Sequence, residues 1–468
     1  MSARTRAIRP LVILLLCLSS ATRSAANTAP IAWDRVAEDS AAMLSDYIRI
    51  DTQNPPGTTT QATVFLTGLL ARAGMRPEIV AGANPDKPAL VARLPGRGGG
   101  GKPIVLLNHM DVVPADPARW SFPPLAGEIR DGVVYGRGAL DMKGLGIAML
   151  MAMRLLAERG EQPQHDLVFL AVPDEEVGGV QGAAWLAQNR PDLLDAEAVW
   201  DEGGIGATDL LPAPALMISV TEKQVLWAKL SVEGPAGHGS KPIVGAAPRR
   251  LVEALTRVLD NPPAPRLTPI ARDVFRRVGV HVSGMEGFAL RRLNNPVVWL
   301  FADGLLQQEP WSAAMTRDTV ALTMLDAGYK PNVIPERAEA VLDCRLLPDT
   351  KPAAFLEQLR KTIDDADVRL ELLQEPETTP ASPTDTPLFR AMAQAAATVY
   401  PDVVVTESMT LGGTDSRFFR HRGIPAYGFF PVLLSKQYTA AVHGVDERIP
   451  VEALGDAVRV IYEALRTL

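Results

Sequence analysis

The sequence predicts an α/β fold with two parts. The larger is a doubly wound domain with a mostly parallel sheet, and the smaller is an inserted α+β domain of ferredoxin-like type. Three observations lead to this prediction. The chain has 468 residues, and a single hydrophobic core rarely stabilises a chain of that length. Its first third alternates fully apolar runs with segments of helical period, as α/β domains do. This pattern changes in the middle of the chain and returns after Pro380, which indicates an insertion.

The parallel sheet is predicted from three apolar runs, which are Ile104–Leu107, Leu167–Val172 and Ala196–Trp200. A run that is apolar throughout fits a parallel strand, because helices bury both of its faces. Between the first two runs, Lys143–Glu158 repeats apolar side chains with a helical period. The pattern resumes with a helix near Pro387–Thr398 and a strand near Ala426–Val432.

The middle of the chain predicts the order strand–helix–strand–helix–strand. These elements cover Leu226–Val232, Ala246–Leu259, Ala338–Leu346, Ala353–Ile363 and Val368–Leu373. Residues 263–318 lengthen this part, and the sequence gives them no assignment. We therefore expect a first part of the main domain at 27–222, an inserted domain at 223–375 with an extra insertion near 263–318, and a second part of the main domain at 376–468.

Residues 1–26 have the features of a secretory signal peptide. A basic start with Arg4, Arg6 and Arg9 precedes a short apolar run, Leu11–Leu18, and small residues precede Asn27. An uncleaved membrane anchor is the alternative, although the run is too short to span a bilayer. We expect an exported protein, periplasmic or secreted, with no stable membrane insertion after the signal is removed.

The charge of the chain argues against a nucleic-acid partner. The formal net charge is −7, and removing the four arginines of residues 1–26 would lower the 47 basic residues to 43 against 54 acidic ones. Cys17 would leave with the signal, so Cys344 would have no partner for an internal disulfide.

Polar residues follow each predicted strand of the main domain. They are His109 and Asp111 after the first strand, Glu175 and Glu176 after the second, and Asp201 and Glu202 after the third. Open parallel sheets bind ligands at the carboxyl ends of their strands. We therefore expect these side chains to meet in one crevice, joined by Asp141 from a glycine-punctuated loop and by His443.

Two histidines and several carboxylates favour zinc or a similar divalent ion. Without a cation the carboxylates would repel one another, whereas two cations could share one carboxylate and hold a hydroxide between them. Neighbouring residues in extended chain point opposite ways, so Glu175 and Glu176 could divide the roles of base and ligand. Of the pair after the third strand, Asp201 is preferred because it follows the apolar run directly, and Glu202 is the alternative.

Each of these residues also has a plainer interpretation. His109 could be an ordinary histidine at a strand end, Asp141 could cap the helix that follows it, and the acidic pairs could lie in solvated loops. Asp111 strengthens the metal interpretation, because a side chain two residues on faces the same way and could fix the tautomer of the His109 imidazole.

Six segments together resemble the motifs of a known family, the dinuclear zinc amidohydrolases. That family includes acetylornithine deacetylase, succinyl-diaminopimelate desuccinylase, aminoacylase and the glutamate carboxypeptidases. The segments His109–Pro114, Gly136–Gly144 and Asp174–Gly179 resemble its general motifs. The segments Trp200–Gly204, Gly413–Phe419 and His443–Glu447 are more similar to its carboxypeptidase S branch, which also holds secreted hydrolases of N-acyl amino acids.

The resemblance implies a role for each candidate ligand. His109 and Asp201 would hold one zinc ion, Glu176 and His443 the other, and Asp141 would bridge both. Glu175 would be the general base, and the peptide bond after Asp141 would be cis. Co²⁺ or Mn²⁺ would be the expected substitutes for the two Zn²⁺ ions.

The resemblance also makes the inserted domain a lid that completes the active site. His238 would steady the oxyanion, often across a homodimer, while Asn332, Arg345 and Gly413 would contact the substrate. Taken alone, His238 is more typical of a turn, and Arg345 could pair with a neighbouring aspartate. The extra insertion leaves open whether this lid forms a homodimer.

These expectations converge on a metallocarboxypeptidase or N-acyl-amino-acid amidohydrolase. Such an enzyme cleaves an amide or peptide bond next to a free carboxylate, and the motifs do not separate the two substrates, a small peptide and an N-acyl amino acid. A catalytically silent periplasmic peptide-binding protein on the same fold is the alternative, and the complete ligand set argues against it.

Overall fold

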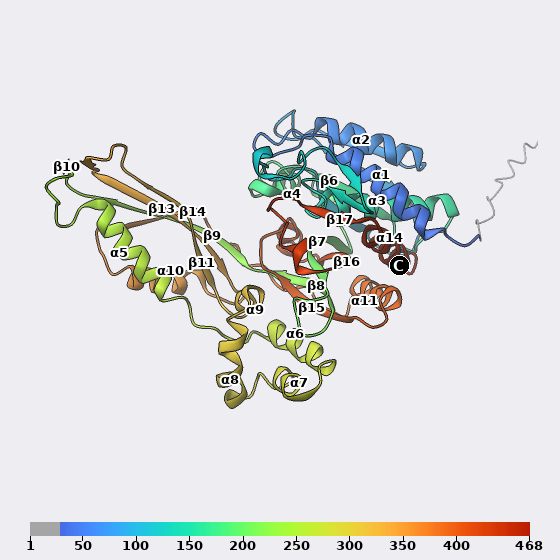
Figure 1. The fold of residues 1–468 in the computed structure, drawn as a ribbon. Coiled ribbons are helices and arrows are strands. Elements are labelled where there is room, and N and C mark those ends of the chain that lie inside the picture. Colours follow the sequence, from blue (N-terminus) through green and yellow to red (C-terminus); the bar gives the residue numbers. More distant parts are fainter. Residues whose placement is uncertain (1–28) are drawn as a thin grey trace, which may run out of the picture.

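The computed structural model describes residues 29–468, so the expected signal peptide at 1–26 lies outside the described residues. Figure 1 shows a main α/β domain, from which a lid projects to one side and a group of small helices projects below. No helix within residues 29–468 combines the length and apolar character needed to cross a membrane.

The main domain is built on an eight-stranded sheet in the order β1-β2-β6-β3-β7-β16-β8-β15. These strands are Arg76–Val80, Ala89–Leu94, Leu167–Val172, Ile104–His109, Ala198–Ala207, Ala426–Leu434, Ala215–Glu222 and Val404–Thr410. Strand β3 lies between β6 and β7 and runs parallel to both. The three predicted strands are confirmed as β3, β6 and β7, and the mostly parallel sheet is confirmed with them. Strand β7 is longer than predicted, because it continues through the acidic residues to Ala207.

Helices cover both faces of this sheet, as a doubly wound fold requires. One face packs against helices α1 (Trp33–Ile48), α2 (Thr60–Arg72), α3 (Lys143–Arg159), α11 (Pro387–Val399) and α14 (Val451–Leu465). The other face packs against α4 (Ala183–Asn189) and α12 (Ser416–Arg420). A small sheet of β4 (Glu128–Arg130), β5 (Val133–Tyr135) and β17 (Arg448–Pro450) lies beside the main one.

The lid is a four-stranded antiparallel sheet in the order β11-β13-β9-β14. Its strands are Thr319–Ala327, Arg337–Leu346, Gln224–Glu233 and Arg369–Gln374, and helices α5 (Ala247–Asp260) and α10 (Pro352–Ile363) pack on it. Strand β11 was not predicted, and it completes the βαββαβ order of a ferredoxin-like domain. A two-stranded ribbon of β10 (Gly237–His238) and β12 (Val333–Ile334) forms the far end of the lid (Figure 1).

The extra insertion forms four helices, α6 (Pro269–Val280), α7 (Gly284–Leu290), α8 (Pro296–Leu306) and α9 (Pro310–Thr316). We expected it to lengthen the lid. Its buried residues, such as Phe275 and Met315, instead share a core with Met217 of β8 and Met409 of β15. The insertion therefore packs on the edge of the main domain, below the lid in Figure 1.

Candidate active site

The predicted cluster assembles at the carboxyl ends of the parallel strands. His109 ends β3, and Glu175 and Glu176 form a short turn directly after β6. Asp141 lies just before α3, and His443 belongs to the loop before β17. These five residues come from distant parts of the sequence, and the strand order of the sheet brings them to one edge.

Asp141 lies between the two histidines. Its Oδ1 is 3.1 Å from His109 Nε2, and its Oδ2 is 3.0 Å from His443 Nε2. Each oxygen of one carboxylate therefore faces a different imidazole, which is the arrangement of a bridging ligand. The peptide bond between Asp141 and Met142 is cis, as the resemblance implied.

The buried imidazole of His109 is oriented by a backbone oxygen. Its Nδ1 lies 2.9 Å from the carbonyl oxygen of Asp111, so Nδ1 is the donor and Nε2 is directed at Asp141. The Asp111 carboxylate, which we expected to fix this tautomer, is 3.8 Å from Nδ1. It instead accepts the N–H groups of Glu175 and Glu176, both at 3.2 Å, and so orients the acidic turn.

The two glutamates of that turn point in different directions. Glu176 Oε2 is 3.2 Å from His443 Nε2, so it joins the half of the cluster around Asp141 and His443. Glu175 groups with His109 and Glu202, and donor atoms of these three residues lie within 4.8 Å of one another. The expected division of the pair into two roles is therefore reflected in two positions.

Glu202, and not Asp201, reaches the cluster. Glu202 Oε1 is 3.5 Å from His109 Nε2, whereas Asp201 is buried and accepts a hydrogen bond of 2.8 Å from Ser416 Oγ. The reason is that β7 continues through both residues, and successive side chains of a strand point to opposite faces. The sequence interpretation ended the strand before Asp201 and so preferred Asp201 to Glu202.

The charges of the cluster are not balanced by the protein alone. Burial, followed by the charge of Glu202, raises the pKa of Glu175 well above its usual range, and burial and Asp141 do the same for Glu202. Hydrogen bonds to Asp141 and Glu176 raise the pKa of His443 to about 10. Four acids and two histidines gathered in one place are a donor set that suits divalent cations, so the residues present fit a metal site.

Sequence reasoning missed the groups that hold the cluster in place. The buried carboxylate of Glu447 accepts the N–H groups of Leu140 at 2.8 Å and Asp141 at 3.1 Å. It also pairs with Arg137 at 2.7 Å, and Arg137 donates to the carbonyl oxygen of Gly444. Arg137 and Glu447 lie within the segments that resemble the family motifs. Their position next to the candidate ligands in the sequence could therefore have indicated this role.

A second buried network supports the turn after β6. Lys87 pairs with Asp174 at 2.5 Å and donates to Asn54 Oδ1 at 3.3 Å. Asn54 in turn donates to the Asp111 carboxylate at 2.8 Å. Nothing in the sequence near Asn54 or Lys87 indicated this role, because these residues lie far from the motifs.

The expected substrate residues are spread over the lid and the main domain. His238 and Asn332 lie at the far end of the lid, in and beside the β10–β12 ribbon (Figure 1). Arg345 lies near the other end of β13, where its Nε and Nη2 donate hydrogen bonds to the Asp343 carboxylate. This is the ion pair that its plainer interpretation predicted. Gly413 lines the cleft beside the acidic cluster. The structure therefore brings Gly413 to the cluster and leaves His238 and Asn332 away from it.

The cleft at the cluster has a volume of 360 Å³ and two kinds of lining residue. The charged ones are Asp141, Glu175, Glu176, Glu202 and His443. The apolar ones are Leu140, Leu145, Ile205, Phe430 and Val442. A few convergent polar groups on a largely apolar surface are typical of a small-molecule site.

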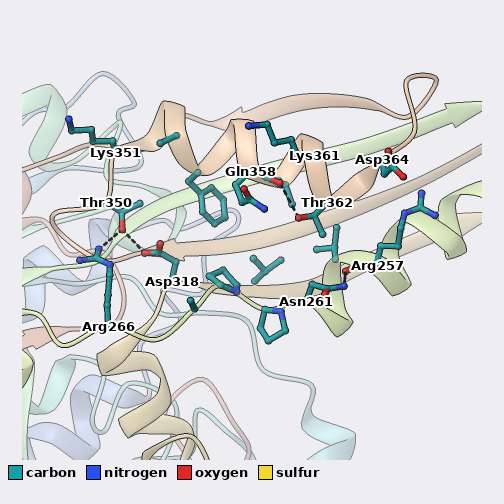
Figure 2. A pocket seen from close by; sticks show the side chains of 18 of the residues that line it. Arg257, Asn261, Arg266, Asp318, Thr350, Lys351, Gln358, Lys361, Thr362 and Asp364 are labelled. Atoms are coloured by element: carbon teal, nitrogen blue, oxygen red, sulfur yellow. Dashed lines mark hydrogen bonds between the residues drawn. The ribbon is translucent and has the colours of Figure 1, made fainter. Parts of the chain in front are cut away.

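A larger cavity of 970 Å³ lies on the lid between α5 and α10. Figure 2 shows that its polar side chains are bonded to one another: Arg266 contacts Thr350, and Thr350 contacts Asp318. Arg266 also pairs with Asp349 at 2.6 Å. Arg266, Asp318 and Asp349 are thus bonded within the lid, and the lining of this cavity includes no histidine.

The fold joins a main α/β domain to a smaller inserted α+β domain, and the cleft of the main domain carries a cluster of acids and histidines that could hold a metal ion. The sequence matches the profile of Peptidase family M20/M25/M40 over residues 105–467, and the chain belongs to this family. It is an enzyme of the class that contains metallocarboxypeptidases and N-acyl-amino-acid amidohydrolases.

Two curated relatives are similar over most of their length. N-fatty-acyl-amino acid synthase/hydrolase PM20D1 of Mus musculus is 33% identical over 382 residues, which cover 78% of this chain and 74% of the relative. Probable carboxypeptidase S-like 2 of Dictyostelium discoideum is 31% identical over 376 residues, which cover 78% and 71%. A solved M20 metallo-carboxypeptidase from Sulfolobus solfataricus has a TM-score of 0.70 at 21% identity and covers 92% of this chain and 98% of its own, which shows a shared fold.

Proposed function

We propose that the protein is a two-zinc hydrolase that cleaves an amide bond next to a free carboxylate. One observation carries this proposal: the two oxygens of Asp141 face His109 and His443 at 3.1 and 3.0 Å. A carboxylate between two imidazoles, with further acids beside each, is a donor set for a pair of ions.

The geometry supports a revised ligand set. His109 and Glu202 would hold one ion, Glu176 and His443 the other, and Asp141 both. When bound, the ions would lower the pKa of a water molecule toward neutrality and polarise the substrate carbonyl. Co²⁺ or Mn²⁺ are the expected substitutes, because carboxylate-rich sites also accept them.

Glu175 is the proposed general base. Its carboxylate lines the cleft beside His109 and Glu202, and burial with nearby acids raises its pKa well above the usual range. The raised pKa makes Glu175 a stronger base toward water than an ordinary carboxylate, and its protonated form can then return the proton to the leaving amine. The Asp111 carboxylate holds the backbone N–H of Glu175 and so positions this base.

The lid is proposed to complete the site. Arg345 would release Asp343 and bind the substrate carboxylate in its place, because its planar guanidinium can donate two parallel hydrogen bonds to either carboxylate. His238 and Asn332 would serve from a partner chain of a homodimer, because the far end of the lid points away from the main domain of its own chain (Figure 1). We propose that the lid comprises residues 223–375. We also propose that the protein is exported to the periplasm or the medium.

Exchanging Glu175 for glutamine tests the proposed base. Glu175→Gln should retain both metal ions and lose about three or more orders of magnitude in kcat, because glutamine cannot accept the proton. Glu128→Gln is the matched control, because Glu128 is a half-buried residue of β4 and does not line the cleft. Turnover by Glu175→Gln within about tenfold of the wild type would exclude this base.

Metal analysis and a substrate panel separate the remaining alternatives. Two ions per chain, with hydrolysis of N-acyl amino acids or dipeptides, support the enzyme. Tight peptide binding without metal or turnover would support a silent periplasmic binding protein instead. Comparing dipeptides with N-acyl amino acids then decides between the two substrate classes.

A further inference from the structure

A second cavity adjoins the candidate active-site cleft. Its volume is 190 Å³, and it shares Gly203, Gly204 and Ile205 of β7 with the 360 Å³ cleft. Close packing requires both glycines: a Cβ on Gly203 would lie 2.3 Å from Thr410 Oγ1, and one on Gly204 would lie 2.1 Å from the carbonyl oxygen of Met217. The two cavities therefore meet along this segment of β7, where both glycines pack closely against β8 and β15.

The lining of this second cavity is uncharged. Apart from the three shared residues, it consists of Met217, Ser219, Trp311, Ser408, Met409 and Leu411. Four of these six side chains are apolar, and the other two are serine hydroxyls. The Ser219 hydroxyl is buried and has no hydrogen-bond partner among the described residues.

The extra insertion contributes to the closure of this cavity. Trp311 belongs to α9, and its ring meets Phe275 of α6 edge-on, with ring centroids 6.4 Å apart and planes at 79°. Both residues pack with the core that contains Met217 and Met409 of the main domain. Residues 269–316 thus supply an aromatic wall to a cavity that begins beside the acidic cluster.

We propose that the second cavity receives the far end of a long N-acyl chain, and that Trp311 limits the length of that chain. This inference rests on the proposed function, because the amide must lie at the acidic cluster. From there an acyl chain would follow the apolar side chains of Leu145, Ile205 and Phe430 and pass the glycines of β7.

The chemistry of the cavity favours a hydrocarbon chain over a peptide. A peptide extending the same distance would bring an ammonium group and further amides into it. The cavity offers no carboxylate and only two hydroxyls, and burying an amide without partners costs roughly 1–3 kcal/mol. Methylene groups incur no such cost and gain from leaving water.

Two substitutions of Ser219 test the proposal against a polar ligand. N-acetyl-, N-octanoyl- and N-palmitoyl-phenylalanine would be compared on the zinc-loaded full chain. Ser219→Leu fills the cavity, so kcat/KM should fall about fourfold for each methylene excluded. The acetyl substrate, which does not reach the cavity, should change by less than about threefold. Ser219→Ala should keep the long-chain activity, because a hydrocarbon needs no hydroxyl.

Trp311 provides a variant with the opposite effect. Trp311→Ala should raise the ratio of palmitoyl to octanoyl turnover by about tenfold, since it lengthens the cavity. Leu300→Ala is the control from the same insertion, because Leu300 lies on α8 and is 75% exposed. Competitive inhibition by free decanoate, compared with acetate, gives a second measurement that does not depend on the amide bond being cleaved.

Each failure has a separate meaning. Equal losses on all three substrates in Ser219→Leu, with no change in decanoate inhibition, would overturn the acyl-chain site while leaving the hydrolase intact. Loss of long-chain activity in Ser219→Ala would also overturn it, since that result requires a polar ligand. If Ser219→Leu does not fold, an unchanged chain-length ratio in Trp311→Ala overturns the inference. Absence of hydrolysis of any amide by the wild type would instead refute the proposed function.

Discussion

At the scale of single residues, the register of β7 decides which acid would bind metal. Glu202 faces His109, whereas Asp201 faces Ser416 on the other side of the strand. Glu202→Gln should therefore lose one of two zinc ions per chain and most activity. Asp201→Asn should keep both ions, because an amide oxygen still accepts the Ser416 hydroxyl. Metal content by mass spectrometry checks both, and loss of an ion in Asp201→Asn alone would restore Asp201 as the ligand.

The same pair illustrates what the sequence could predict at this scale. Residue type and motif were enough to gather His109, Asp141, Glu176 and His443, because few other side chains serve as zinc ligands. They were not enough to choose between Asp201 and Glu202, because that choice depends on where a strand ends. The Asp111 carboxylate was misassigned for a similar reason: its backbone carbonyl is the group that lies at hydrogen-bond distance from His109.

Protons and metal ions should compete for the cluster. In the metal-free protein, hydrogen bonds to Asp141 and Glu176 raise the pKa of His443 to about 10, so this imidazole holds its proton at neutral pH. Binding zinc must displace that proton, so the apparent zinc affinity should increase as the pH rises from 6 to 9, by up to about tenfold per unit for each proton released. Calorimetry in buffers of different ionisation enthalpy measures the release. An affinity that does not change with pH would contradict this assignment of charge.

At the scale of elements, the Glu447–Arg137 pair joins the loop that carries Asp141 to the loop that carries His443. Both side chains are almost fully buried. Glu447→Gln should lower the free energy of unfolding by about 3 kcal/mol, because it leaves a buried guanidinium unpaired. It should also weaken zinc binding, since Asp141 loses its orientation. Urea unfolding measures this change. The control is Glu158→Gln, because Glu158 forms only an exposed i,i+4 pair with Arg154, and this variant should lower the free energy of unfolding by less than about 0.5 kcal/mol. Equal stability of the two variants would refute this role.

Elements with a clear periodicity were predicted to within a few residues. Helix α3 and strands β3 and β6 are examples, because apolar residues occupy nearly every position that the sheet or its helices bury. Strand β11 was not predicted, because most of its residues are exposed or half-buried and its two faces therefore differ little in burial. Helix α8 of the insertion was not predicted because it has apolar residues on all sides and no buried residue, so its pattern lacks an inner face.

At the scale of the whole molecule, the position of the lid separates His238 from the catalytic cluster. His238 lies on the ribbon at the far end of the lid, exposed, with its Nδ1 bonded to Ser240 (Figure 1). A residue in this position would reach a cleft only in a second copy of the chain. If it steadies the oxyanion there, the functional unit is a homodimer in which each site combines residues of two chains.

Mixing two inactive variants tests this arrangement directly. Glu175→Gln lacks the base and His238→Ala lacks the oxyanion donor, so each alone should lose about two or more orders of magnitude in kcat. In a mixed dimer, the chain that keeps Glu175 receives His238 from its partner and regains one intact site. Co-refolded equimolar variants should therefore recover about a quarter of wild-type activity, since about half of the dimers are mixed and each has one working site.

Recovery should be absent when Glu175→Gln is mixed with Glu176→Gln, because both changes damage the same cleft region and the mixed dimer still lacks an intact site. A mixture of Glu175→Gln and His238→Ala that stays inactive, while light scattering shows dimers, would exclude a role for His238 across the interface.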